Sequence, residues 1–185
     1  MTLRSGMVTI IDTWRRMVDD ADSAVWTDDQ AQEILDRQRA DFWEEQLAPI
    51  PLLIDGSAQY RTYASAWENV EGTASGTTAW RLYTSDGSAA TSAYTVNAER
   101  GLVTFTADQG GTTYYLDGRS YDLAGAAADG WQERMAKVSG WYSFESEGKR
   151  FSRSDYFKHC QAMAEYYRRH SKPMYTTIRR EDVNL

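Results

Sequence analysis

The side chains best suited to acid–base or nucleophilic chemistry are few, and their spacing does not combine them. The two histidines, His159 and His170, lie near the end of the chain among basic residues. Neighbouring cations lower the pKa of a histidine but supply no nucleophile and no carboxylate to orient the ring, so we do not expect a general base here. Cys160 follows His159 directly, and adjacent residues on a helix point in different directions, so a catalytic Cys–His pair is not expected either.

Carboxylates are abundant, but their pattern is not that of a catalytic pair. Adjacent acidic residues occur at Asp19–Asp20, Asp28–Asp29 and Glu44–Glu45. An acidic chain offers many combinations of two carboxylates, so helix caps and solvated faces explain this pattern better than glycoside hydrolysis does. The sequence contains no phosphate-binding glycine motif and no GxSxG motif. We therefore expect no enzyme activity and no cofactor.

The sequence also lacks the spacing of a metal site. A single cysteine, Cys160, can form neither an internal disulfide nor a cysteine-rich zinc site. The acidic run from Asp19 to Asp22 lacks the glycine and the distal glutamate of a calcium-binding loop. Because Cys160 lies in a helical pattern beside Met163 and Ala164, we expect it to be a buried, unreactive thiol.

The overall charge limits which partners the chain can bind. Its 185 residues include 20 Lys and Arg against 27 Asp and Glu, which gives a net charge of −7. Such a chain repels the phosphates of nucleic acids, so binding DNA irrespective of sequence is disfavoured, although DNA could still slide past its surface. The apolar run at residues 7–11 is too short for a signal peptide, and no stretch of about 20 apolar residues is present. We expect synthesis in a cytoplasm and no membrane span.

The first part of the chain has helical periodicity. Apolar residues spaced three and four apart form one stripe, which consists of Ile10, Ile11, Trp14, Met17, Val18 and Ala21. A second helix is predicted after Thr27, because Thr27 and Gln30 match a capping box. Its apolar stripe consists of Ala31, Ile34, Leu35 and Phe42. We predict a helical hairpin over residues 8–46.

Pro49 and Pro51 then interrupt the helical pattern, and the periodicity changes to that of strands. Short runs rich in aromatic and β-branched residues alternate with turns containing Gly, Asn and Asp. These runs occupy residues 60–67, 79–83, 93–96, 102–106 and 113–116. The pattern predicts a compact antiparallel β module.

Helical periodicity returns near the end of the chain. One helix is predicted after Asp122, which is a suitable N-cap, and another after Ser154. Gly125 and Gly130 weaken the first of these helices by about 1 kcal/mol each relative to Ala. Pro173 ends the second helix.

The predicted fold class is therefore α+β: a small helical bundle, made of the helical hairpin and two C-terminal helices, with an inserted antiparallel β module. We predict four regions. They are the N-terminal helical hairpin at 1–48, the inserted β module at 49–119, the C-terminal helices that complete the bundle at 120–171, and an extended tail at 172–185.

Aromatic residues make up 13% of the chain and leave two functions open. Trp and Tyr are favoured in protein–protein interfaces. Those of the β module could instead form a stacking platform for carbohydrate, or they could be cross-strand pairs within a core. The residues concerned are Tyr60, Tyr63, Trp67, Trp80, Tyr83, Tyr94, Tyr114 and Tyr115. A carbohydrate- or surface-binding module is therefore the alternative to an assembly protein.

Several segments match a known family in their order and composition. They are 20–29 (DADSAVWTDD), 34–39 (ILDRQR), 118–131 (GRSYDLAGAAADGW) and 163–168 (MAEYYR), together with Phe144, Gly148, Phe151, Arg153 and Ser154. From about residue 8 to residue 171, this pattern resembles the head–tail adaptor (connector) proteins of long-tailed bacteriophages.

The resemblance implies a structural virion protein of the phage neck. Such adaptors form a ring, commonly twelve-fold, that binds the capsid portal and extends the DNA channel. The ring presents a surface to the next neck or tail protein, and DNA passes through it without specific binding. The implied location is the head–tail interface of the virion, and such adaptors often stay monomeric until they meet the portal.

The C-terminal tail is the candidate interface. It has no packing pattern but combines apolar and basic side chains, namely Met174, Tyr175, Ile178, Arg179 and Arg180. We expect it to become ordered on contact with the portal or a neighbouring subunit, although a frayed terminus without a role fits the same pattern. The net charge of −7 also favours an acidic channel lumen that repels DNA.

Overall fold

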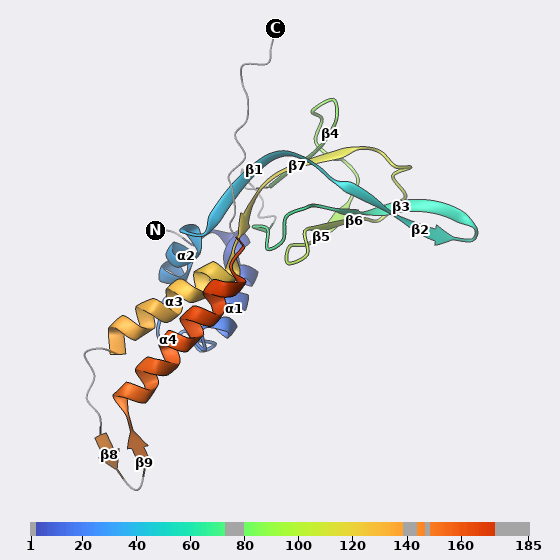
Figure 1. Ribbon diagram of the computed structural model, residues 1–185. Helices are drawn as coiled ribbons and strands as arrows, with labels where there is room; N and C mark the ends of the chain where they lie inside the picture. The colour runs from blue at the N-terminus through green and yellow to red at the C-terminus, as the bar shows by residue number, and fades with distance from the viewer. Residues whose placement is uncertain (1–2, 73–79, 139–143, 147–148, 173–185) are drawn as a thin grey trace. The chain divides into compact units, whose positions relative to one another are not determined.

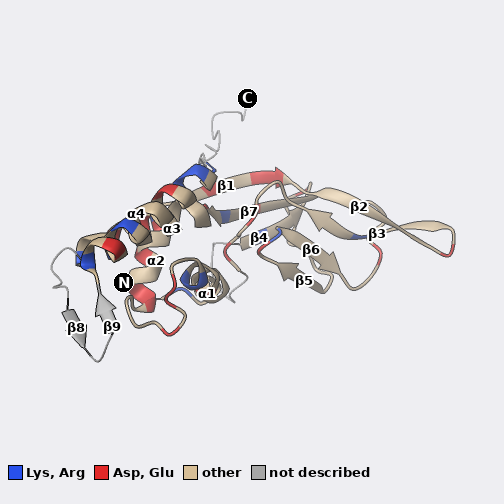
Figure 2. Cartoon of the chain, turned by 60° about the horizontal axis from the view of Figure 1, so that its bottom comes forward, with Lys and Arg blue, Asp and Glu red and all other residues tan. Residues whose placement is uncertain are grey.

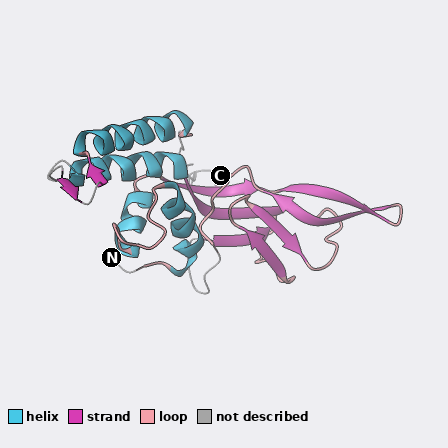
Figure 3. Cartoon of the chain, turned by 90° about the horizontal axis from the view of Figure 1, so that it is seen from below, coloured by secondary structure: helices cyan, strands magenta, loops and turns pink. Residues whose placement is uncertain are grey.

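The computed structural model describes residues 3–72, 80–138, 144–146 and 149–172 (Figure 1). They form two compact units. The helical unit comprises residues 11–38 and 122–172, and the β unit comprises residues 3–10 and 39–121. Helices dominate the first and strands the second (Figure 3). The protein is α+β, and its antiparallel β module is inserted between helices.

The structure contains four α-helices in its described residues, and side-chain caps mark the start of three of them. They are α1 (Val8–Met17), which follows a short 3-10 helix (Ser5–Met7), α2 (Asp28–Asp36), α3 (Leu123–Val138) and α4 (Arg153–His170). The predicted capping box is confirmed, since the Gln30 amide donates to the Thr27 hydroxyl and the Gln30 side chain accepts from the Thr27 amide. The Asp122 carboxylate accepts from the Gly125 amide at the start of α3. Ser152, and not Ser154, caps α4.

Helix α3 packs along α4 and closely approaches the end of α1. A Cβ atom at Gly130 would lie 2.8 Å from a ring carbon of Trp14 and 3.0 Å from a methyl of Val18. Gly130 therefore lowers the helix propensity of α3, but its lack of a side chain lets Trp14 and Val18 approach closely. Between α3 and α4, β8 (Phe144–Ser146) pairs with β9 (Lys149–Phe151).

The predicted helical bundle with an N-terminal helical hairpin is wrong. Helix α2 ends at Asp36, and residues 39–46, expected to be helical, form strand β1 (Arg39–Gln46). Ala40 and Phe42 are buried while their neighbours are more exposed, which is the two-residue period of a strand. Pairing of β1 with a second strand therefore outweighs the helix propensity of this segment.

The strands of the β unit form two antiparallel sheets. Besides β1 they are β2 (Ala48–Ile54), β3 (Ser57–Ala64), β4 (Trp80–Thr84), β5 (Tyr94–Asn97), β6 (Leu102–Phe105) and β7 (Tyr114–Tyr121). One sheet has the order β1-β7-β4 and the other the order β2-β3-β6-β5. The chain passes from the first sheet to the second at Leu47, whose amide bonds the Tyr114 carbonyl.

Both sheets contribute to one aromatic core. Its buried members are Phe42, Leu47, Tyr63, Val70, Trp80, Leu82, Val103, Phe105, Tyr114 and Leu116. The Tyr63 ring meets Phe105 and Tyr114 edge to face, with centroids 5.6 and 5.2 Å away. Such aromatic pairs stabilise a core beyond the area that they bury.

The buried Tyr63 predicts a loss of stability in alkali. Burial raises the pKa of Tyr63 to about 12. An unfolded tyrosine loses its proton near pH 10, so between about pH 10 and 12 only the unfolded chain is deprotonated there, and stability falls as the pH rises. We expect the urea midpoint to fall between pH 9 and 11, and to fall less in Tyr63→Phe. Equal decreases in the two proteins would contradict this assignment.

Candidate interaction surface

The structure separates the side chains that could carry chemistry. His159 is exposed and its ring meets the edge of Trp131, with centroids 5.5 Å apart. His170 lies eleven residues further along α4, where its Nδ1 is 2.7 Å from the Tyr166 carbonyl oxygen. Cys160 is buried as expected, and burial raises its pKa. Within the described residues no three His, Cys, Asp or Glu side chains are grouped to hold a metal ion.

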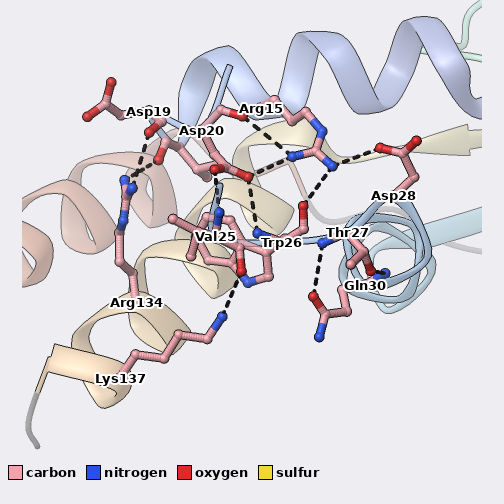
Figure 4. A network of polar contacts seen from close by, with 11 residues as sticks. Arg15, Asp19, Asp20, Val25, Trp26, Thr27, Asp28, Gln30, Arg134 and Lys137 are labelled. Atoms are coloured by element: carbon pink, nitrogen blue, oxygen red, sulfur yellow. Dashed lines mark hydrogen bonds and ion pairs between the residues drawn. The ribbon is translucent and has the colours of Figure 1, made fainter. Parts of the chain in front are cut away.

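Two of the paired carboxylates serve structure in the loop between α1 and α2 (Figure 4). The buried Arg15 guanidinium contacts Asp20 Oδ2 at 2.6 Å, Asp28 Oδ1 at 2.8 Å and the Trp26 carbonyl at 2.8 Å. The Asp20 carboxylate also accepts from the backbone amides of Val25 and Trp26. These groups satisfy one another, which fits a structural ion pair better than a catalytic one.

Basic side chains of α3 bind the same loop. Arg134 donates to the carbonyls of Val18 and Asp19 at 2.6 and 3.2 Å, and Lys137 donates to the Val25 carbonyl at 3.1 Å (Figure 4). Cations at the C-terminal end of α1 also complement the helix dipole.

A buried carboxylate that sequence reasoning missed lies in the β unit. Glu71 accepts from Arg4 Nε at 3.0 Å and from the Tyr121 hydroxyl at 2.7 Å, and Arg119 lies 3.6 Å away. These contacts attach the segment before α1 to the end of β7. Glu71 is held by cations and a hydroxyl, an arrangement that needs no ligand.

The aromatic residues do not form an open platform. Tyr63, Trp80 and Tyr114 are buried, and Tyr60, Trp67 and Tyr94 pack against the same core. The two others, Tyr83 and Tyr115, are half-buried and stack with centroids 5.9 Å apart. The interpretation of these residues as core pairs therefore accounts for six of the eight candidates.

The two most exposed large apolar side chains of the described residues are neighbours on one strand. Leu53 is 76% exposed and Leu52 56%, and Ile50, also on β2, is 43% exposed. Beyond its pairing with β6 at Thr62–Ala64, strand β3 pairs only with β2. The β2–β3 hairpin, residues 48–64, is here called the arm, and its outer part, residues 51–60, projects beyond β6 (Figure 1).

The arm is a well-specified element. Its turn residues, Asp55 and Gly56, have φ values of 50° and 78°, which suit the two-residue turn of a tight hairpin. The pairing Ile54↔Ser57 closes the turn, and the register shifts between Ile50 and Pro51. The apolar exposure of the arm is thus a property of a regular hairpin.

The predicted interface residues Met174, Tyr175, Ile178, Arg179 and Arg180 lie outside the described residues. The arm, by contrast, was not predicted. The dipeptide Asp55-Gly56 between apolar Ile54 and a strand-like run is the signal that could have identified it.

The chain was compared with protein-family models, with curated proteins and with solved structures, and no match was found. Among the described helices none is long and apolar enough to cross a membrane. The arm, on which Leu52 and Leu53 are exposed, is the feature of the described chain that most clearly suggests an interaction.

Proposed function

We propose that this protein is a structural component of a phage neck, which forms a ring between the capsid portal and the tail and extends the DNA channel. The observation that carries the proposal is the arm, a regular hairpin whose exposed apolar side chains suit contact with another protein. Of the described residues that could carry chemistry, Asp20 is held in a buried ion pair with Arg15, and the His159 ring packs on Trp131.

The sequence resemblance to head–tail adaptors supports the same role. Its longest segment, 118–131, runs from the end of β7 through the N-cap of α3 to Trp131. In the proposed ring of twelve copies, each subunit contacts the portal, its neighbours and the next neck or tail protein. The net charge of −7 suits a channel through which DNA passes without binding. The proposed location is the virion neck, after synthesis in the host cytoplasm.

The alternative, a carbohydrate- or surface-binding module, is less well supported. Stacking on sugars needs aromatic faces open to solvent, whereas most of the candidate rings pack in the core of the β unit. Tyr83 and Tyr115 are partly accessible, but they stack on each other. A change in tryptophan fluorescence on adding glycans would favour this alternative.

Co-sedimentation with the portal oligomer from the same genome, followed by electron microscopy, tests the proposal. We expect a ring of this protein seated beneath the portal. Failure of the folded protein to bind the portal or to form rings would contradict the adaptor role. A tail-tube protein from the same genome serves as the matched negative control for portal binding.

A further inference from the structure

We infer that the arms of neighbouring copies stack face to face around the ring, so that the arm is the subunit–subunit contact. This inference rests on the proposed function, because it requires a ring. It goes further by naming the residues on each side of the contact and by fixing how they meet.

Strand β2 carries apolar side chains on both faces of the arm. Side chains alternate along a strand, so Ile50, Leu52 and Ile54 project from one face, and Pro49, Pro51 and Leu53 project from the other. Of these six residues five are exposed and Ile54 is half-buried. A ring that closes by rotation needs two different patches on each subunit. Both faces of one thin hairpin provide them.

Strand addition is disfavoured as the mode of contact. Strand β2 is an edge strand of its sheet, but Pro49 and Pro51 have no amide hydrogen to donate to a further strand. Prolines on an edge are one of the ways in which proteins prevent edge-to-edge pairing. The arm must therefore bind through its side chains, which is what stacking of faces provides.

The charges favour a second copy over a lipid surface. Charged residues are sparse on the arm (Figure 2), which carries Asp55 in its turn and Arg61 on β3. A carboxylate in the turn opposes entry into a bilayer, and a chain of net charge −7 is repelled by anionic lipids. Two such acidic chains also repel each other, so an interface between copies is best placed on an element with few charges and no excess of acidic residues.

Cross-linking tests the stacking directly. The faces of stacked sheets lie about 10 Å apart. The double variant therefore carries Ile50→Cys on one face of the arm and Leu53→Cys on the other, and its rings are treated with a bis-maleimide that spans about 10 Å. The double variant should give a ladder that extends beyond the dimer. An equimolar mixture of the two single variants should stop at the dimer, because each copy then carries one reactive face.

Controls separate this inference from the proposed function. The wild-type protein has one cysteine, Cys160, which is buried. Treating wild-type rings with the same reagent measures any background cross-linking through Cys160. If wild-type rings form and the double variant gives no ladder, stacking is wrong and the adaptor role stands. A dimer from Leu53→Cys alone would show like faces meeting and would also overturn the inference. If wild type forms no ring either alone or with the portal, both proposals fail together.

The tip variant Leu52→Ser with Leu53→Ser supplies an independent test. Since each buried leucine strengthens a contact by at least about tenfold, we expect the variant to stay folded and to lose ring assembly. Tyr166→Ser is the matched control, because Tyr166 on α4 is 54% exposed, close to the 56% of Leu52. Rings that persist in the tip variant would overturn the inference. Selective loss of portal binding or of liposome flotation would assign the arm to that other partner.

Discussion

Replacing Arg15 by Ala is expected to lower the free energy of unfolding by about 3–5 kcal/mol, as for other buried ion pairs that lose one partner. Both Arg15 and Asp20 are almost fully buried, and their closest atoms are 2.6 Å apart. Without the guanidinium, the Asp20 carboxylate stays buried with no cation beside it, and the Trp26 carbonyl loses a donor. The loop between α1 and α2 should then lose its fixed conformation.

The neighbouring Arg16 provides the matched control. Arg16 is exposed and donates only to the Asp12 carbonyl and the Thr13 hydroxyl in the described contacts. Its replacement by Ala should change stability by no more than about 0.5 kcal/mol. Arg15→Lys should be intermediate, because a lysine keeps the charge but cannot reach two carboxylates and a carbonyl as a planar fork does.

Urea denaturation followed by tryptophan fluorescence measures these differences. Trp14 and Trp26, whose ring centroids are 5.3 Å apart next to this ion pair, are two of the seven tryptophans that contribute to the emission. Equal effects of Arg15→Ala and Arg16→Ala would show that the buried ion pair adds no stability to the helical unit.

Local signals predicted the parts of the fold that depend on neighbouring residues. The capping box at Thr27 and Gln30 places the start of α2, and the N-cap at Asp122 places the start of α3. Runs of alternating residues correctly predicted the strands that became β4, β5 and β6. In each case the interaction that sets the element is formed within a few residues, so it can be read from one stretch of sequence.

Residues 39–46 could not be assigned in this way. Phe42 follows Leu35 by seven positions, which fits a helix stripe, yet β1 is set by pairing with β7, whose residues come about 70 to 80 positions later. Arg39 opposite Tyr121 and Phe42 opposite Gly118 are contacts that no local pattern contains. The aromatic ring at position 42 is accommodated because position 118 has no side chain.

The candidate site was missed for a related reason. Pro49 and Pro51 were interpreted as breaks between domains, whereas an edge strand tolerates proline because one side of it needs no donors. Sequence alone did not show that β2 lies at an edge, since that depends on the order β2-β3-β6-β5. Exposure of Leu52 and Leu53 likewise follows from the projection of the hairpin beyond β6.

Replacing Phe42 by Ala is the second substitution with a large expected effect, a loss of about 3–5 kcal/mol typical of a buried Phe. The Phe42 ring stacks on Trp67 with centroids 5.0 Å apart and planes 5° from parallel. The tip of the ring also lies against Gly118, where a Cβ atom would be 2.6 Å from Phe42 Cζ. Truncation would therefore leave a cavity between two sheets that share this core.

Leu53→Ala is the control that separates stability from association. Leu53 lies on the same chain segment, eleven residues after Phe42, but it is 76% exposed, so its truncation should change the urea midpoint very little. We expect Phe42→Ala to unfold at much lower urea by circular dichroism, and Leu53→Ala to unfold like wild type while assembling less well. A small effect of Phe42→Ala would contradict the placement of residues 39–46 in a buried strand. The two variants thus test whether this segment is divided between a core that holds the β unit together and an arm that holds neighbouring copies together.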